Sequence, residues 1–472
     1  MDVGIGFDRR ALLRVGAGAL AVGALGGLAP TAAATLSLAD LKERTFRFFW
    51  ETTDPVTGLA PDRWPTASFS SIAAVGFALT AYPIGVHNGW IDRAAARART
   101  LATLRFFARA PQGPELRHRA GHRGFFYHFL DMTTGKRYHR TELSTIDTSL
   151  LLAGMLFAQS WFDRDHAEEA EIRALADRLY RAVDWTWIRP RSPLVSMGWL
   201  PGKGFIRSDW DKYNESLILY ILALGSPTHP LEPETWDRWT ASFDRSWGNV
   251  DGEPHTQFGP LFGHQYSQIW IDFRGIRDAF GRRRGLDYHE NSRRAVHAQR
   301  AYAVRNPGGW VGYDKDCWGL TACDGPGNFQ VDIGGRARRF YSYSARGPGE
   351  RDDGTLAPTA AGGSVAFAPE IAIPALVEIH RRYGSALYGR YGFLDAVNPT
   401  LTEAPALRHG RLVSGIGWVA SDYLGIDQGP ILAMLENRDS ALVWRTMQGN
   451  PHIQRGLRRA GFSGGWLDSS SV

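Results

Sequence analysis

Cysteine is nearly absent from this chain. The 472 residues include only two, Cys317 and Cys323. Two cysteines are too few for a disulfide framework or for a structural zinc site. Their short spacing permits either one small-loop disulfide or two reduced, buried thiols, and the sequence leaves both alternatives open.

Long apolar runs and concentrated charge are also missing after the first 34 residues. A membrane-spanning helix needs about 18 or more uninterrupted apolar residues, so we expect no stable membrane anchor. The formal net charge is +6, but the arginines lie among acids, as in GRRRGLDYHE, rather than in one basic stripe. This distribution argues against a nucleic-acid partner. The sequence leaves the oligomeric state open.

Several catalytic signatures do not occur. There is no P-loop and no dinucleotide fingerprint, and the single G-x-S-x-G match, GFSGG at residues 461–465, does not follow a strand pattern as a nucleophile elbow does, which weakens the case for a serine hydrolase or a nucleotide enzyme. No H-E-x-x-H motif occurs, and the segment LFGHQYSQIWIDFRG around His264 contains no H-x-x-x-H spacing, so a zinc site is not indicated there. We therefore expect no cofactor and no bound metal. The chemistry that remains is that of carboxylates.

Residues 1–34 have the pattern of an export signal. Arg9 and Arg10 precede the uncharged run VGAGALAVGALGGLAP, and residues 32–34 supply a cleavage site of the A-x-A type. Paired arginines before a mildly hydrophobic run resemble a twin-arginine signal, which exports folded proteins. We predict that the mature protein is one catalytic domain, residues 35–472, in the periplasm or outside the cell.

The hydrophobic pattern of the mature chain is mainly helical. Amphipathic segments such as LADLKERTFRFFWETT alternate with segments that are apolar nearly all round, such as SIAAVGFALTAYPIGV. Strand signals are few and short, as in FFYHFLD. Paired buried and exposed helices predict an all-α fold, an (α/α)6 toroid with long glycine-rich loops and short strands at one end, although no sequence repeat is visible.

Residues 208–220, SDWDKYNESLILY, gather polar and aromatic side chains at the start of an apolar helix. The candidate site residues in this stretch are Asp211, Asn214 and Glu215, with Trp210 and Tyr213 beside them. Carboxylates exchange protons with sugar oxygens, and aromatic faces pack on pyranose rings. The alternative is that Ser208 or Asp209 caps the helix and that the acids only favour its positive end.

Three other segments repeat this combination. TELSTIDTSLLLAG places Glu142 and Asp147 at a helix start, where Asp147 is either a site residue or part of a cap. LFGHQYSQIWIDFRG carries His264 and Gln265, and His264 is either a core histidine or a donor to a sugar hydroxyl. SDYLGIDQGPILAMLEN sets Asp427 between two glycines before an apolar helix, again as a cap or as a site residue.

A glycine-rich stretch at residues 306–363 interrupts the helical pattern. So long a connection inside a compact domain is usually functional. We expect it to cover the pocket and to supply Trp318, Asp324 and Arg346 as sugar contacts, since binding residues concentrate on loops that a rigid scaffold presents. The alternative is a surface loop with Trp318 buried as its anchor.

Several blocks together resemble the glycoamylase-like family over nearly all of the mature chain. They include YNESLILYILALGSPTHPL, PLFGHQYSQIWIDFRG, WGLTACDGP, GTLAPTAAGGS and YLGIDQGPI. Characterised relatives include bacterial endo-β-1,2-glucanases, (α/α)6-barrel enzymes that invert the anomeric centre. The resemblance implies that Glu215 is the general acid and Asp427 the general base. An inverting hydrolase needs such a pair roughly 6.5 to 9.5 Å apart.

These observations predict an exported inverting glycoside hydrolase that acts on an oligo- or polysaccharide, a β-glucan and by preference a β-1,2-glucan. We expect Glu215 and Asp427 to face one pocket at the same end of the toroid, because both lie at the start of an apolar helix. Two alternatives stay open: a glycosidase or lyase for another glycan, and a catalytically silent glycan-binding protein. The residues do not decide between endo and exo action.

Overall fold

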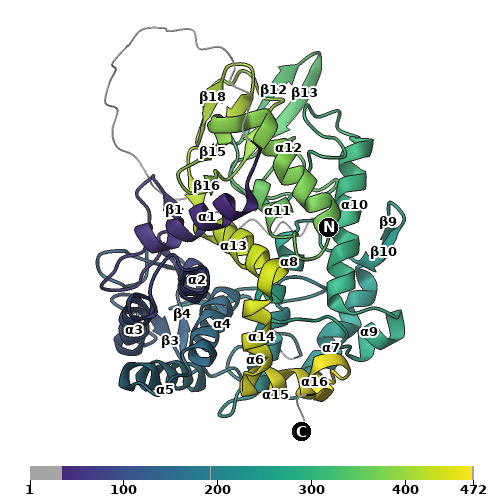
Figure 1. The fold of residues 1–472 in the computed structure, drawn as a ribbon. Helices are drawn as coiled ribbons and strands as arrows, with labels where there is room; N and C mark the ends of the chain where they lie inside the picture. Colours follow the sequence, from purple (N-terminus) through teal and green to yellow (C-terminus); the bar gives the residue numbers. More distant parts are fainter. Residues whose placement is uncertain (1–34, 192, 470–472) are drawn as a thin grey trace.

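The computed structural model describes residues 35–191 and 193–469, so the expected export signal in residues 1–34 lies outside the described residues. The described chain is rich in helix (Figure 1). The helices are α1 (Leu38–Thr52), α2 (Ile72–His87), α3 (Arg93–Arg109), α4 (Thr145–Trp161), α5 (Ala167–Arg181), α6 (Leu217–Gly225), α7 (Glu234–Thr240), the 3-10 helix η1 (Ala241–Arg245), α8 (Phe262–Trp270), α9 (Ala279–Arg284), α10 (Tyr288–Arg305), α11 (Pro358–Gly362), α12 (Pro369–Leu387), α13 (Gly425–Ser440), α14 (Leu442–Gln448), α15 (Pro451–Arg459) and α16 (Gly465–Ser469).

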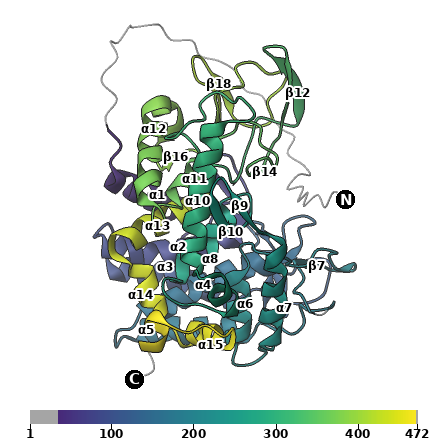
Figure 2. The same cartoon turned by 90° about the vertical axis from the view of Figure 1, so that its right-hand side faces the viewer.

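The strands are short and pair in small antiparallel sheets of two or three strands. They are β1 (Arg63–Trp64), β2 (Ser70–Ser71), β3 (Gly121–His122), β4 (Phe125–Phe126), β5 (Phe129–Leu130), β6 (Leu143–Ser144), β7 (Gly198–Leu200), β8 (Gly204–Phe205), β9 (Trp247–Val250), β10 (Glu253–Thr256), β11 (Ala322–Cys323), β12 (Phe329–Ile333), β13 (Arg336–Phe340), β14 (Ser344–Ala345), β15 (Tyr388–Gly389), β16 (Gly392–Phe393), β17 (Val397–Asn398), β18 (Arg411–Val413), β19 (Gly417–Val419) and β20 (Tyr423–Leu424). Figure 2 draws β7 and β12 on its right-hand side.

The inner helices are apolar on nearly all sides because each is covered all round. Each inner helix contacts the next one in the order α2, α4, α6, α8 and α13, and α13 in turn contacts α2, so that the order closes on itself. The short helix α11 joins α13 to α8, where Gln265 donates a hydrogen bond to the Ala360 carbonyl over 2.9 Å. Every residue of α6 is buried, as a helix without a polar face requires.

Amphipathic helices pack against the outside of this inner set. Helix α1 lies against α2 and α13, α3 and α5 against α2 and α4, α10 against α8, α12 against α11, and α15 against α6. Helix α1 shows the local logic: Ser37 caps it by accepting a hydrogen bond from the Asp40 amide, and Leu41, Phe48 and Phe49 are buried on one face.

Short strands lead directly into three inner helices and bring their starts together. β2 precedes α2, β6 precedes α4 and β20 precedes α13. β1 pairs with β20, β2 pairs with β5, and a bridge joins Tyr127 to Leu143 in β6. We call the end of the molecule where α2, α4, α6 and α13 begin the mouth. Helix α6 starts there too, because Trp210 just before it donates from Nε1 to Thr145 Oγ1 at the start of α4 over 3.0 Å.

The glycine-rich stretch is more ordered than its composition suggests. It folds into the hairpin of β12 and β13, the pair of β11 and β14, and helix α11. Together with residues 396–420 it forms a second small core, made of Cys323, Phe340, Ala357, Ala396, Leu401, Trp418 and Ala420. Cys317 and Cys323 are free, buried thiols, which corresponds to the alternative of two reduced cysteines and not to a disulfide.

No helix of the described residues is both long and apolar enough to cross a lipid bilayer.

Candidate active site

The backbone of Glu215 is held just before the first residue of α6. Ser267 Oγ on α8 donates to the Glu215 carbonyl over 2.6 Å and accepts from the Ile218 amide over 2.9 Å. Asn214 Oδ1 accepts from the Ser216 amide over 3.0 Å and from its hydroxyl over 2.6 Å. α6 therefore begins without a side-chain cap of its own, because Ser267 and Asn214 satisfy the amides that every helix start leaves open.

The Glu215 carboxyl is suited to hold a proton. Its Oε2 atom is buried and has no hydrogen-bond partner among the described residues, although the residue as a whole keeps some exposure. Burial raises the pKa of Glu215 to about 8, and the negative charge of Asp147 adds to the shift. The group is thus protonated at neutral pH, as a general acid must be.

Asp147 and Glu142 are joined by a histidine that the sequence reasoning missed. His128 Nδ1 lies 2.7 Å from Glu142 Oε1, and its Nε2 lies 3.4 Å from Asp147 Oδ2. Ser144 caps α4 through the Asp147 amide, and its hydroxyl also donates to Asp147 Oδ2 over 2.5 Å. Asp147 therefore belongs to the helix start and also acts electrostatically on Glu215. The polar His128 between the aromatic residues of FFYHFLD was the available signal.

Asp427 lies in the first turn of α13 and is 3% exposed. The glycines beside it allow α13 to pack closely on α2. A Cβ at Gly429 would lie 2.2 Å from the Phe77 ring, and one at Gly425 would lie 2.6 Å from the Ala74 methyl group. Thr359 on α11 donates to the Asp427 carbonyl over 2.9 Å. Helix packing therefore determines where this carboxylate stands, at the positive end of a helix.

Three further acids surround Asp427, and two of them were absent from the predicted site. Asp395 is near enough to Asp427 for that side chain to influence its pKa, which burial raises, and the Oδ2 atom of Asp395 accepts from the Asp324 amide over 2.6 Å. Arg63 donates from Nη1 to Asp324 Oδ2 over 2.7 Å and lies 3.5 Å from Asp422 Oδ2. Asp324 thus belongs to the mouth, paired with an arginine.

A hollow of about 230 Å³ opens beside Arg63. Its other lining residues are Ala67, Ser68, Phe69 and Tyr138. The Phe69 ring packs between Tyr138 and Phe129, with centroid distances of 4.7 and 4.2 Å, and Phe129 stacks on His128 at 4.0 Å. The hollow therefore has the acids around Arg63 on one side and, across an aromatic stack, the His128 group on the other. Aromatic side chains beside a charged group are the usual lining of a sugar site.

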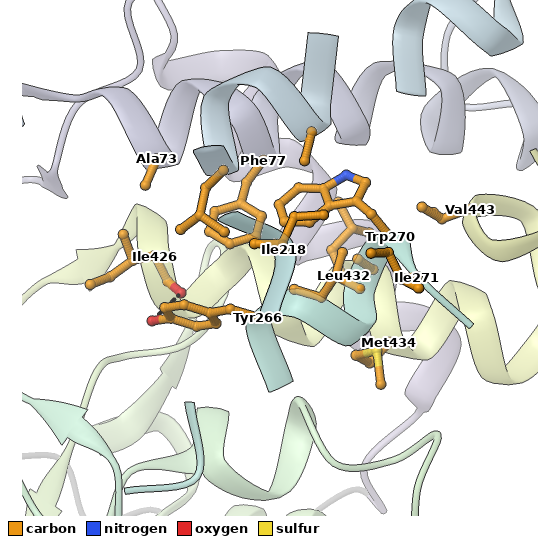
Figure 3. Close-up of a cluster of buried hydrophobic side chains, with 14 of the residues drawn as sticks. Ala73, Phe77, Ile218, Tyr266, Trp270, Ile271, Ile426, Leu432, Met434 and Val443 are labelled. Atoms are coloured by element: carbon orange, nitrogen blue, oxygen red, sulfur yellow. Dashed lines mark hydrogen bonds between the residues drawn. The ribbon is translucent and has the colours of Figure 1, made fainter. Parts of the chain in front are cut away.

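One turn of α8 contacts the backbone next to both proposed catalytic acids. Ser267 holds the Glu215 carbonyl, and the neighbouring Tyr266 hydroxyl donates to the Ile426 carbonyl over 3.3 Å. Figure 3 shows Tyr266, Ile218 and Ile426 in one buried cluster that also contains Phe77 and Trp270. The starts of α6 and α13 are thus anchored on the same apolar layer.

Two predicted sugar contacts on α8 lie in the core instead. His264 is 1% exposed, its Nε2 donates to the Phe258 carbonyl over 3.2 Å, and burial lowers its pKa to about 3. Gln265 is also 1% exposed and donates to Ala360 and Ser364. These predictions are corrected: both side chains join α8 to its neighbours and do not face a sugar.

Two predicted contacts from the glycine-rich stretch are likewise structural. Trp318 has no exposed surface and packs in the main core. Arg346 has no exposed surface either, and it donates to both carboxylate oxygens of Asp353 over 2.8 and 2.9 Å and to several backbone carbonyls. The expectation that they bind sugar is wrong, because Trp318 anchors the stretch in the main core and Arg346 is used up by partners inside the stretch.

The two remaining predicted residues, Asn214 and Asp211, both contact neighbouring parts of the chain. Asn214 also donates to the carbonyls of Asp211 and Lys212 over 3.1 and 3.2 Å, so its polar atoms organise the turn before Glu215. Asp211 is partly exposed and forms an ion pair with Arg245. No group of three or more His, Cys, Asp or Glu side chains in the described part of the chain is arranged to hold a metal ion.

Comparisons with known proteins show what the chain as a whole is similar to. A family model described as "Putative glucoamylase" matches residues 207–451. The curated "Exo beta-1,2-glucooligosaccharide sophorohydrolase (non-reducing end)" of Parabacteroides distasonis is 29% identical over 89% of this chain, which spans 57% of that relative's length.

Two solved structures superpose on nearly the whole chain. A protein of Bacteroides uniformis, described as a "putative glucoamylase", is 30% identical with a TM-score of 0.78, over 91% of this chain and 98% of its own. An endo-β-1,2-glucanase of Chitinophaga pinensis, solved with sophorotriose and glucose, is 28% identical with a TM-score of 0.76, over 92% of this chain and 100% of its own.

Proposed function

Because the chain belongs to the glycoamylase family, we propose that it is a glycoside hydrolase that cleaves β-1,2-glucan or its oligosaccharides. Two relatives similar over most of this chain are named for β-1,2-glucan cleavage, one exo-acting and one endo-acting. The observation that supports the proposal is that Glu215, whose pKa burial raises to about 8, and Asp427 stand at the starts of two inner helices, whose backbone beside each acid is held by the same turn of α8.

The proposed reaction inverts the anomeric centre. Glu215 gives its proton to the leaving glycosidic oxygen, and Asp427 takes a proton from the attacking water. The O–H bond that breaks in the water supplies the hydroxide equivalent that bonds to the anomeric carbon. Glu215 ends as a carboxylate and Asp427 as an acid, and solvent restores both.

Two further features belong to the same proposal. The closed order of inner helices, each with an amphipathic helix outside it, supports an (α/α)6 toroid. The signal-like pattern of residues 1–34 supports export by the twin-arginine route to the periplasm or beyond.

Isosteric substitution of each acid tests the assignment. Glu215→Gln and Asp427→Asn keep the shape of the side chain but remove the proton donor and the base, so each should lower kcat on β-1,2-glucan by about 10²- to 10⁴-fold. Reducing-sugar release from a panel of glucans measures it. Glu171→Gln, on the outer helix α5 and paired there with Arg105, is the matched control and should keep wild-type activity.

The outcomes separate the alternatives. Wild-type activity in either variant would remove that residue from the mechanism. A folded wild-type protein that shifts in affinity electrophoresis but releases no sugar would be a glycan-binding protein. Release from another glucan alone would move the proposal to that linkage.

A further inference from the structure

Strand β13 and the loop that follows it concentrate positive charge. Residues 336–351 contain five arginines and only one acid. Of these arginines only the buried Arg346 is paired, with Asp353, and the other four form no ion pair with a carboxylate of the described chain. By contrast, Arg381 on α12 is exposed too but is paired with Glu378. The ion pairs of the fold therefore leave this charge uncompensated.

Two of the four unpaired arginines converge on one tyrosine. The guanidinium carbons of Arg339 and Arg351 lie 5.3 and 5.9 Å from the centroid of the Tyr341 ring. Both arginines are exposed, and the Tyr341 hydroxyl makes no hydrogen bond within the described chain. Arg351 is held there at a φ of 51°, a left-handed conformation that is uncommon outside glycine and that occurs at ligand clamps. Together these groups offer hydrogen-bond donors and positive charge to an anion.

This group lies at the rim of the mouth. Strands β11 and β14 pair, so Asp324, just after β11, stands beside the residues just before β14. The approach is close, since a Cβ at Gly325 would lie 2.2 Å from the Tyr341 carbonyl oxygen. Asp324 itself accepts from Arg63, which lines the hollow of the mouth. The backbone of Tyr341 is therefore a direct neighbour of the mouth.

We propose that Arg339, Tyr341 and Arg351 form a subsite for an oxyanion that the glucan carries, such as a phosphate ester on a sugar ring away from the cleaved bond. This inference rests on the proposed function, because it takes a β-1,2-glucan as the body of the ligand. A sugar hydroxyl both donates and accepts hydrogen bonds, whereas a guanidinium group only donates and bears a charge, so the pair of arginines selects a charged acceptor. The place at the rim favours a group attached to the substrate, since a free anion or a lipid surface would not need the mouth.

Calorimetric titration of the full chain tests the subsite, with Glu215→Gln present in every protein to prevent turnover. The probes are a β-1,2-linked pentasaccharide, the same pentasaccharide with one phosphate ester, and inorganic phosphate. The phosphorylated pentasaccharide should bind about 10-fold more tightly than the neutral one, as two exposed ion pairs allow. This preference should shrink as the salt concentration rises. It should be lost when Arg339→Gln and Arg351→Gln are combined.

Arg336→Gln is the matched control on the same strand. Arg336 shares its face of β13 with Arg338, which donates to the carbonyls of Gly308 and Gly309 over 3.0 and 3.1 Å, whereas Arg339 points to the opposite face. Arg336→Gln removes the same charge as Arg339→Gln but should keep the preference within about 2-fold, because distant exposed charges are screened. Equal losses in these two variants would show a general attraction to positive charge and would overturn the subsite. Melting curves confirm that each variant is folded.

The neutral pentasaccharide separates this inference from the proposed function. If it binds but the phosphate ester adds nothing, only the inference fails. If it does not bind and the wild type releases sugar from no glucan, the proposed function fails and the inference fails with it. Inorganic phosphate that binds as tightly as the phosphorylated pentasaccharide would assign the arginines to a free anion. Capture by phosphatidylglycerol vesicles, with no preference between the pentasaccharides, would assign them to a membrane surface, and either result would overturn the proposal.

Discussion

The raised pKa of Glu215 suits it to donate a proton, and it also lowers the stability of the folded protein at pH values where the unfolded glutamate is ionised. Its raised pKa follows first from burial and then from Asp147, so the folded state holds this proton more tightly than the unfolded chain does. Asp278 is also buried and its pKa is also raised, but Trp236, Tyr288 and the Gly281 amide all donate to it. Glu215 differs in that its Oε2 atom is buried without a hydrogen-bond partner among the described residues, which is expected where chemistry needs a mobile proton.

The sign of this shift predicts a pH-dependent gain in stability for Glu215→Gln. The unfolded glutamate ionises near its ordinary value of 4.5 and the folded one near 8, so the penalty is absent below about 4.5, grows between these values and is complete above 8. The amide never ionises. Urea unfolding at several pH values should show little difference between variant and wild type at pH 4.5 and a clear advantage for the variant at pH 8.5.

The exposed Glu171 provides the control for that measurement. Its pKa is lowered, first by the hydrogen bond from Arg105, so Glu171→Gln should show no growing advantage between pH 4.5 and 8.5. A difference between Glu215→Gln and wild type that does not change with pH would mean that Glu215 is ionised in the folded protein.

At the scale of elements, the crossing of α2 and α4 depends on two glycines. A Cβ at Gly76 would lie 2.3 Å from the Leu150 carbonyl oxygen, and one at Gly154 would lie 2.2 Å from the Gly76 carbonyl oxygen. Both contacts are with backbone, which cannot turn aside as a side chain can. The starts of α2 and α4 carry β2 and β6, so this crossing also sets the spacing of the mouth.

Gly76→Ala should therefore destabilise the protein even though alanine is the better helix former. We expect a loss of about 1–3 kcal/mol in the free energy of unfolding, measured by urea denaturation. Gly449→Ala is the control, because its Cβ would meet only the Thr446 carbonyl oxygen at 3.5 Å, an ordinary contact. Equal stability of the two variants would show that α2 and α4 can move apart at little cost.

At the scale of the whole molecule, a buried polar group around Lys42 joins the first and last inner helices, α2 and α13. Lys42 on α1 lies 3.0 Å from both Glu436 and Asp439 of α13. Glu436 has no exposed surface and also accepts from Asn88, just after α2, over 2.8 Å. The polar group thus joins segments almost 400 residues apart in sequence at the place where the order of inner helices closes.

Lys42→Met should weaken this closure, because it leaves Glu436 buried without its cation. Removing one partner of a buried pair commonly costs about 3 kcal/mol or more, which urea unfolding would detect. Arg47→Met is the matched control on the same helix: its partner Glu43 is exposed, and such pairs contribute about 1 kcal/mol or less. Similar small losses in both variants would show that Asn88, Ser440 and His87 satisfy Glu436 without the lysine.

The sequence by itself determined the helical character of this protein and the chemistry of its mouth. Apolar residues on all sides of 72–87 and 217–225 predict buried helices, because a helix without a polar face must be covered. The acids at helix starts, Asp147, Glu215 and Asp427, were recognisable because apolar helices do not need them for packing. The family resemblance rested on these same blocks, and the comparisons confirm it.

Only the tertiary structure decided which polar residues meet at the mouth. Arg63 and Asp395 stand in segments without a distinctive pattern. His128 is conspicuous among aromatic residues, but nothing local shows that β1, β5 and the end of β16 lead to one place. Conversely, Trp318, His264 and Arg346 have the composition of sugar contacts but lie in the interior. The physical reason is that periodicity reports which face of a segment is buried, whereas the partner of a polar side chain depends on how the helices close around the core.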